Sequence, residues 1–106
     1  MSGVSYPFRY QYEHCAANAT TALGGTGATG DLIARLVCTV STAATGIVKV
    51  IDGGGAGVLT HTVLPNSPGG GIGVYVIELG AASQTGGWSV LTGAGVEVMA
   101  MGIFSA

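Results

Sequence analysis

The side chains that could support chemistry are few and widely spaced in this sequence. His14, Cys15, Cys38 and His61 could in principle supply four zinc ligands, because zinc prefers imidazole and thiolate. Structural zinc sites usually combine close pairs, such as two cysteines separated by two residues, and the chain has no such pair. We therefore expect no bound metal. We interpret His61, which lies between two threonines, as a hydrogen-bonded or exposed strand residue.

Acid–base hydrolysis would need two convergent carboxylates, or a nucleophile beside a base. The five carboxylate residues are scattered along the chain, and no G-x-S-x-G motif occurs. The run GTGATG at residues 25–30 fits the dinucleotide pattern G-x-G-x-x-G, but no hydrophobic strand precedes it and the residues that follow would cut its helix short. We interpret the run as a loop, and we expect no enzyme activity, no catalytic residue and no cofactor.

The two cysteines are too few for a disulfide framework. The first residues, MSGVSYPFRYQYEH, show no basic start followed by an apolar block, so we expect no secretory signal. Cys15 and Cys38 are then expected to be buried thiols, although a single bridge would be possible if their strands were adjacent.

The elements that must position these residues are short strands, which recur about every ten residues between glycine-rich turns, as in a sandwich or barrel. In residues 31–40, Leu32 and Leu36 alternate with Ile33 and Arg35, and the β-branched second half favours a strand over a short helix. Nothing has the length and period of a long amphipathic helix. We predict an all-β fold, a β-sandwich or jelly roll over residues 14–106. Further strands are expected within residues 14–23, 47–52, 58–65, 73–80, 88–91 and 96–104.

Residues 1–13 are predicted to form an extended N-terminal arm. Tyr6, Phe8, Tyr10 and Tyr12 occupy alternate positions, so an extended chain would present all four rings on one face. Two interpretations remain open. The rings cover the end of the domain's own core, or the arm lies on a neighbouring subunit, since chain ends are loose unless they are docked.

Several predicted strands are apolar on both faces. In residues 96–104, valine, alanine and phenylalanine face one way while methionine and isoleucine face the other. A sandwich in water needs only one apolar face per sheet, so a second one implies cover from another chain. The candidates for packing between subunits are Trp88, Met99, Met101 and Ile103.

Composition narrows the class of protein further. The chain has 106 residues, enough for one domain, with 20 glycines, eight charged residues and a net charge of −2. Its three cationic residues, Arg9, Arg35 and Lys49, are too few for a phosphate-binding patch, so we expect no direct contact with nucleic acid. No apolar run approaches the roughly 18 residues that suggest a membrane span.

The ending TGGWSVLTGAGVEVMAMGIF and the middle segment TGIVKVIDGGGAGVLTHTVLP resemble small virion proteins of tailed bacteriophages. The resemblance covers about Leu32 to Phe104 and lies in the pattern of strands and turns rather than in a diagnostic motif. It implies a β-sandwich or jelly-roll module that decorates capsids or builds tails, commonly as a trimer.

The expected function is therefore that of a non-enzymatic capsid decoration, or cement, protein. It would be made in the host cytoplasm, lie on the outer capsid surface, and contact the major capsid protein and further copies of itself. The first candidate contact is the arm from Tyr6 to Tyr12. The alternatives are a phage tail or fibre component and a carbohydrate-binding β-sandwich module, which would need aromatic rings in a platform on the folded domain.

Overall fold

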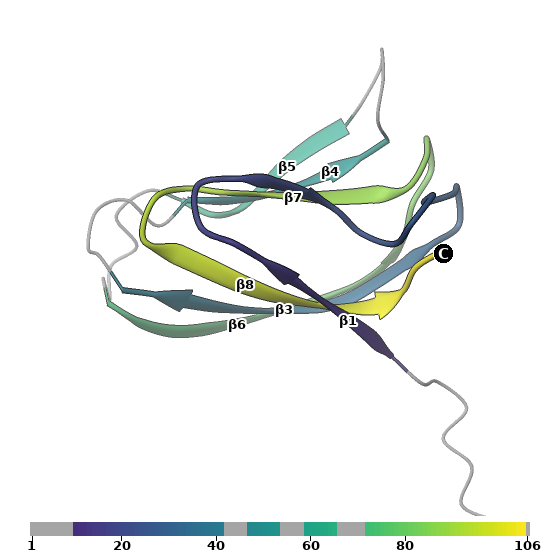
Figure 1. The fold of residues 1–106 in the computed structure, drawn as a ribbon. Coiled ribbons are helices and arrows are strands. Elements are labelled where there is room, and N and C mark those ends of the chain that lie inside the picture. The colour runs from purple at the N-terminus through teal and green to yellow at the C-terminus, as the bar shows by residue number, and fades with distance from the viewer. Residues whose placement is uncertain (1–9, 42–46, 54–58, 66–71, 106) are drawn as a thin grey trace, which may run out of the picture.

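The computed structural model describes residues 10–41, 47–53, 59–65 and 72–105 of the chain. These residues form strands and turns without a helix (Figure 1). The strands are β1 (Gln11–Cys15), β2 (Thr20–Ala22), β3 (Leu32–Val40), β4 (Val48–Asp52), β5 (Leu59–Leu64), β6 (Gly73–Ala82), β7 (Trp88–Thr92) and β8 (Val96–Ile103).

The strands form two antiparallel sheets that face each other, in the orders β1-β8-β3-β6 and β2-β7-β4-β5 (Figure 1). The chain pairs as one long hairpin would, with β4 beside β5, β3 beside β6, β2 beside β7 and β1 beside β8. Rolling this hairpin up adds the pairs β3–β8 and β4–β7. This arrangement is a jelly roll, so the predicted all-β sandwich is confirmed.

The core lies between the two sheets because alternate residues of the strands point inward. In β4 and β7 every second residue is buried, and Val48 and Val90 are fully enclosed. Burying an aliphatic side chain of this size contributes about 1.5–3 kcal/mol. The enclosed side chains include Leu23, Leu36, Val40, Val96, Val98, Ala100 and Phe104.

Strand β3 departs from the simple alternation that the sequence predicts. A register shift lies between Ile33 and Arg35 in the pairing of β3 with both neighbours. Strict alternation places Leu32 with Leu36 inside and Ile33 outside, but Ile33 is fully buried and Leu32 is only half-buried. The extra residue of a β-bulge reverses the faces beyond it, which accounts for the exchange.

The predicted end of the arm, at residue 13, lies inside the first strand of the structure. Gln11–Cys15 pairs with β8, so residues 11–13 belong to the sheet, whereas residues 1–9 lie outside the described part of the chain. The predicted segment 14–23 contains the end of β1 and all of β2, joined by a turn at Asn18 with a φ of 55°. In the described residues no helix is long and apolar enough to cross a membrane.

Candidate functional site

The outward side of the β1-β8-β3-β6 sheet carries a row of side chains that crosses all four strands. His14 pairs with Met99, Met99 with Val37, and Val37 with Val76. Val76 is 58% exposed and Met99 is 37% exposed. We call this surface the outer apolar face and define it by Tyr12, Val37, Val74, Val76, Met99, Met101 and Ile103.

The outward side of the other sheet is polar by comparison. Among the described residues, none of its outward side chains is an exposed large hydrophobic one. Alternation with the buried core places mainly hydroxyl-bearing and small side chains there, with one lysine and two half-buried aliphatic side chains. These residues are Thr20, Ala22, Lys49, Ile51, Thr60, Thr62, Ser89 and Leu91. The two sheets therefore differ in what they present to their surroundings.

An ion pair lies in the second row of the outer apolar face, where Tyr12 pairs with Met101, Met101 with Arg35, and Arg35 with Glu78. The Arg35 Nε donates to Glu78 Oε2 over 2.6 Å, and both side chains are largely exposed. An exposed pair of this kind contributes little to stability. Its two charges cancel, so this row adds no net charge to the apolar surface around it.

The structure separates the residues that the sequence singled out. Met99, Met101 and Ile103 lie on the outer apolar face, with Tyr12 beside Met101, as the alternation predicts. Tyr10 is exposed and directly precedes β1, and Tyr6 and Phe8 lie outside the described residues. Trp88 is 5% exposed and lies in the core between the sheets, away from that outer face.

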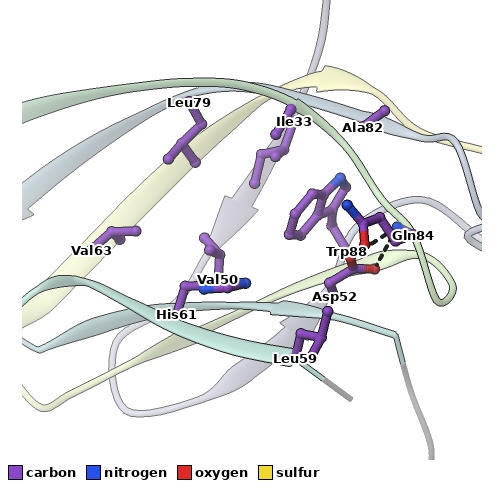
Figure 2. A pocket seen from close by; sticks show the side chains of 11 residues that line it. Ile33, Val50, Asp52, Leu59, His61, Val63, Leu79, Ala82, Gln84 and Trp88 are labelled. Carbon is purple, nitrogen blue, oxygen red and sulfur yellow. Dashed lines mark hydrogen bonds between the residues drawn. The ribbon is translucent and has the colours of Figure 1, made fainter. Parts of the chain in front are cut away.

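A pocket of about 350 Å³ opens between the edge strands β5 and β6 (Figure 2). Leu59, His61 and Val63 line it from β5, and Leu79 lines it from β6. The Trp88 ring forms part of the wall, and Ile33 and Val50 line the pocket on either side of it. This combination of an apolar wall with few polar groups is typical of a binding pocket.

Asp52 fixes one end of the pocket (Figure 2). Its carboxylate accepts hydrogen bonds from the Gln84 N–H at 2.9 and 3.0 Å and from the Thr85 N–H at 3.1 Å. Burial opposes ionisation, but the N–H groups of Thr85 and Gln84, the Thr85 hydroxyl and nearby His61 outweigh it and lower the pKa of Asp52. The Asp52 carboxylate therefore stabilises the turn between β6 and β7.

Asp31, which directly precedes β3, also stabilises a loop through its carboxylate. Its carboxylate accepts bonds from the Ala28 N–H at 3.1 Å and from the Ser105 N–H and hydroxyl at 3.0 and 2.7 Å. Burial raises the pKa of Asp31, but the bonds from Ser105 and Ala28 lower it by more. The Asp31 carbonyl accepts the Trp88 Nε1–H at 2.9 Å. Residues 25–30 are thus a loop anchored to the fold, followed by a strand rather than by the helix of a dinucleotide site.

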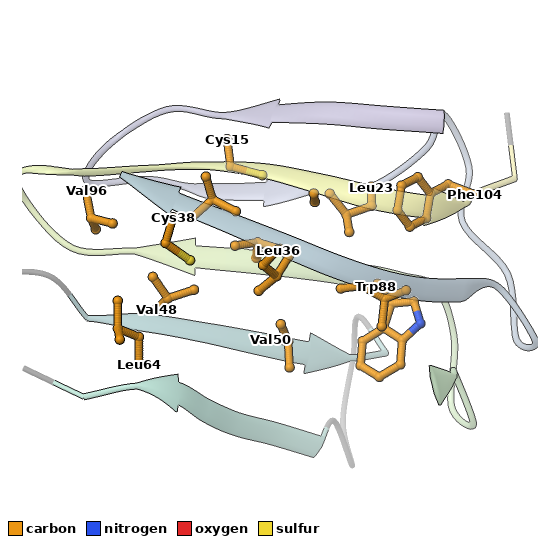
Figure 3. Packing of buried hydrophobic residues seen from close by; sticks show 14 of the residues in the cluster. Cys15, Leu23, Leu36, Cys38, Val48, Val50, Leu64, Trp88, Val96 and Phe104 are labelled. Atoms are coloured by element: carbon orange, nitrogen blue, oxygen red, sulfur yellow. The ribbon is translucent and has the colours of Figure 1, made fainter. Parts of the chain in front are cut away.

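Both thiols are buried and unbridged (Figure 3). Cys15 and Cys38 both pair with Val98, one from each side, so two strand spacings of about 9–10 Å separate their backbones. A disulfide needs Cα atoms within about 7 Å, so this geometry forbids the bridge. Burial raises the pKa of each thiol to about 11.

The four possible zinc ligands point to different places. His14 faces outward in β1, Cys15 and Cys38 face the core, and His61 lines the pocket from the other sheet. Among the described residues no group of three histidine, cysteine or carboxylate side chains could hold a metal ion.

Sequence reasoning missed the pocket and three members of the outer apolar face, Val37, Val74 and Val76. The alternation of Leu59, His61 and Val63 signalled one side of a strand, but nothing in the sequence indicated that β5 and β6 would both be edge strands on the same side. Val74 and Val76 belonged to a segment recognised as apolar on both faces, but they were not chosen.

Comparisons of the chain with protein-family models, with curated proteins and with solved structures found no match.

Proposed function

We propose that this chain is a non-enzymatic structural protein of a bacteriophage virion that binds the assembled capsid and stabilises it. The observation that carries the proposal is the difference between the two sheets, one apolar on its outward side and the other polar. Contiguous exposed apolar surface is typical of a face that another protein covers. The assignment to a bacteriophage virion rests on the sequence alone, whose pattern of strands and turns resembles that of small virion proteins.

Mechanically, such a protein acts by adding contacts across the seams between capsid subunits. A module that binds the assembled lattice, and not its separate subunits, stabilises the lattice by mass action. Many copies make modest interfaces act together. The outer apolar face suits this role, because the charges of Arg35 and Glu78 neutralise each other and Glu97 is the other charged side chain among the described outward residues of this sheet.

The test is co-sedimentation with capsids assembled without the chain, from the phage whose genome encodes it. Met99→Lys places a charge at the centre of the outer apolar face, and Ser89→Lys places the same charge on the outward side of β7. We expect Met99→Lys to weaken capsid binding about tenfold or more, equal to about 1.4 kcal/mol, and Ser89→Lys to bind like the wild type. Equal binding by both variants would contradict the proposal.

The contribution of the arm needs a shorter deletion than the sequence suggested. Because Gln11–Cys15 is a strand of the sheet, removing residues 1–13 would damage the fold, whereas removing residues 1–9 leaves β1 complete. If the arm contacts the capsid, this shorter deletion weakens co-sedimentation while the circular dichroism of the domain is unchanged. A tail or fibre location would instead appear as labelled protein at the tail in electron micrographs.

A further inference from the structure

Each sheet of the sandwich has two edge strands, and a pocket opens where the edges β5 and β6 face each other. β6 pairs only with β3 and β5 only with β4, so within the described residues each sheet ends there with an unpaired edge. The pocket opens between these two edges, and its lining comes from alternate residues of β5, which is the pattern of a core surface that lacks its cover. An added strand at such an edge gains backbone hydrogen bonds and fills the space between the sheets.

The chain carries a segment whose chemistry fits this edge. Counting from Val4, every second residue up to Phe8 is apolar, with Tyr6 between them. In an extended strand, residues of one parity share both a side-chain face and a hydrogen-bonding edge. Pro7 has the other parity, so its missing N–H costs no hydrogen bond when the N–H groups of Val4, Tyr6 and Phe8 point to β6.

The size of the pocket matches two aromatic rings. A cavity of roughly 150 Å³ accepts one benzene molecule in another protein. The pocket here measures about 350 Å³, enough for the rings of Tyr6 and Phe8. His61 and Gln84 lie in its wall and could bind a tyrosine hydroxyl.

The arm of one molecule is too short to add as a strand to its own β6 edge. Gln11, Gly102, Ile33 and Ala81 form one row across the sheet, so the arm begins three strand spacings, about 14 Å, from the β6 edge. Counted from Gln11, Phe8 is three residues away and reaches about 10 Å, and Tyr6 is five residues away and reaches about 17 Å. A strand added beside β6 would lie four strand spacings, about 19 Å, from β1.

We therefore propose that residues 4–8 of one copy add as a strand to the β6 edge of a second copy, with Tyr6 and Phe8 in its pocket. The contact is head-to-tail, so each copy gives one arm and accepts another, and copies close into a ring or extend as a filament. A closed ring of any size would use every arm and every pocket. The proposal concerns contacts between copies and does not depend on capsid binding.

Site-directed crosslinking of the full chain tests this arrangement without any capsid. Two variants, Phe8→Cys and Leu59→Cys, are mixed under mild oxidation, and the heterodimer is measured on a non-reducing gel. Leu59 lines the pocket and is 41% exposed, whereas the native thiols are buried and remain unreactive. The matched control pairs Arg9→Cys with Leu59→Cys, because position 9 has the opposite parity to Phe8 and lies on the other face of an extended strand. We expect a yield about tenfold lower for the control, because disulfide geometry is strict.

A second measurement covers the case in which an added cysteine disturbs the fold. Light scattering over a range of concentrations compares the wild type with Tyr6→Ser/Phe8→Ser and with the control Ser5→Ala. We expect association of the wild type and of Ser5→Ala, and at least about tenfold weaker association of the double variant. Equal crosslinking of both cysteine pairs, or association that the double variant retains in full, would overturn the proposal.

Discussion

Two buried aspartates hold the turns at one end of the sandwich, and both are poised to be ionised. Asp31 fixes residues 25–30 and Ser105, and Asp52 fixes the turn at Gln84 and Thr85. Because hydrogen bonds hold the pKa of each carboxyl below its ordinary 3.8, the folded state binds protons less readily than the unfolded chain. Both groups therefore stabilise the fold above that ordinary pKa.

The stability of the protein should accordingly fall in acid. Stability from these two groups is fully present above about pH 5 and is lost as the pH falls through their lowered pKa values. Urea unfolding at a series of pH values from 7 to 2 measures this. Asp52→Asn should flatten the dependence and cost about 1–3 kcal/mol at neutral pH, because its charged hydrogen bonds are lost. An unchanged slope in this variant would show that Asp52 is not responsible.

The two buried thiols are expected to be unreactive in the folded protein. Burial raises their pKa to about 11, so at pH 8 they are protonated as well as enclosed. We expect Cys15 and Cys38 to react with a thiol reagent such as dithionitrobenzoate only after unfolding in urea. Two rapid equivalents in the native protein would mean that this part of the core opens freely.

At the scale of the strands, much of the fold follows from the sequence. Alternation and turn spacing predict β3 to β8 within a residue or two, and they predict that Met99, Met101 and Ile103 face away from Val96 and Val98. The bulge in β3 is not predictable, because it depends on pairing with β6 and β8 rather than on the local residues. Trp88 does not lie on the outer apolar face with the other candidates for subunit contacts, because the sequence of a short strand does not show which way a large ring faces.

Two glycines in these strands are required for different reasons, one by close packing and the other by its backbone conformation. Gly102 has an ordinary backbone conformation, but an added Cβ would collide with the Leu32 carbonyl oxygen and the Phe104 ring. Gly80 has open space around it and a φ of +62°, which disfavours any other residue.

We expect Gly102→Ala to cost about 3 kcal/mol through overpacking and Gly80→Ala to cost about 1–2 kcal/mol through backbone strain. Chemical denaturation measures both free energies of unfolding. The reverse order would mean that β3 and β8 are not packed as closely as described.

At the scale of the whole molecule, the jelly roll leaves two kinds of surface for contacts. The outer apolar face lies on one flat side, and the open edge with its pocket lies between β5 and β6. A single copy could therefore bind a lattice with its face and a neighbour with its edge. Sequence alone predicted the first surface and not the second, since which strands become edges is decided by the rolled topology.

The most direct test of the central proposal is the oxidation of Met99 and Met101 by hydrogen peroxide, followed by mass spectrometry, in the free chain and in the chain bound to capsids. Both methionines lie on the outer apolar face, and covered thioethers oxidise slowly. The account predicts that capsid binding slows oxidation of both residues about tenfold or more, as expected when water is excluded from an interface core. Equal oxidation rates in the free and bound chain would contradict it.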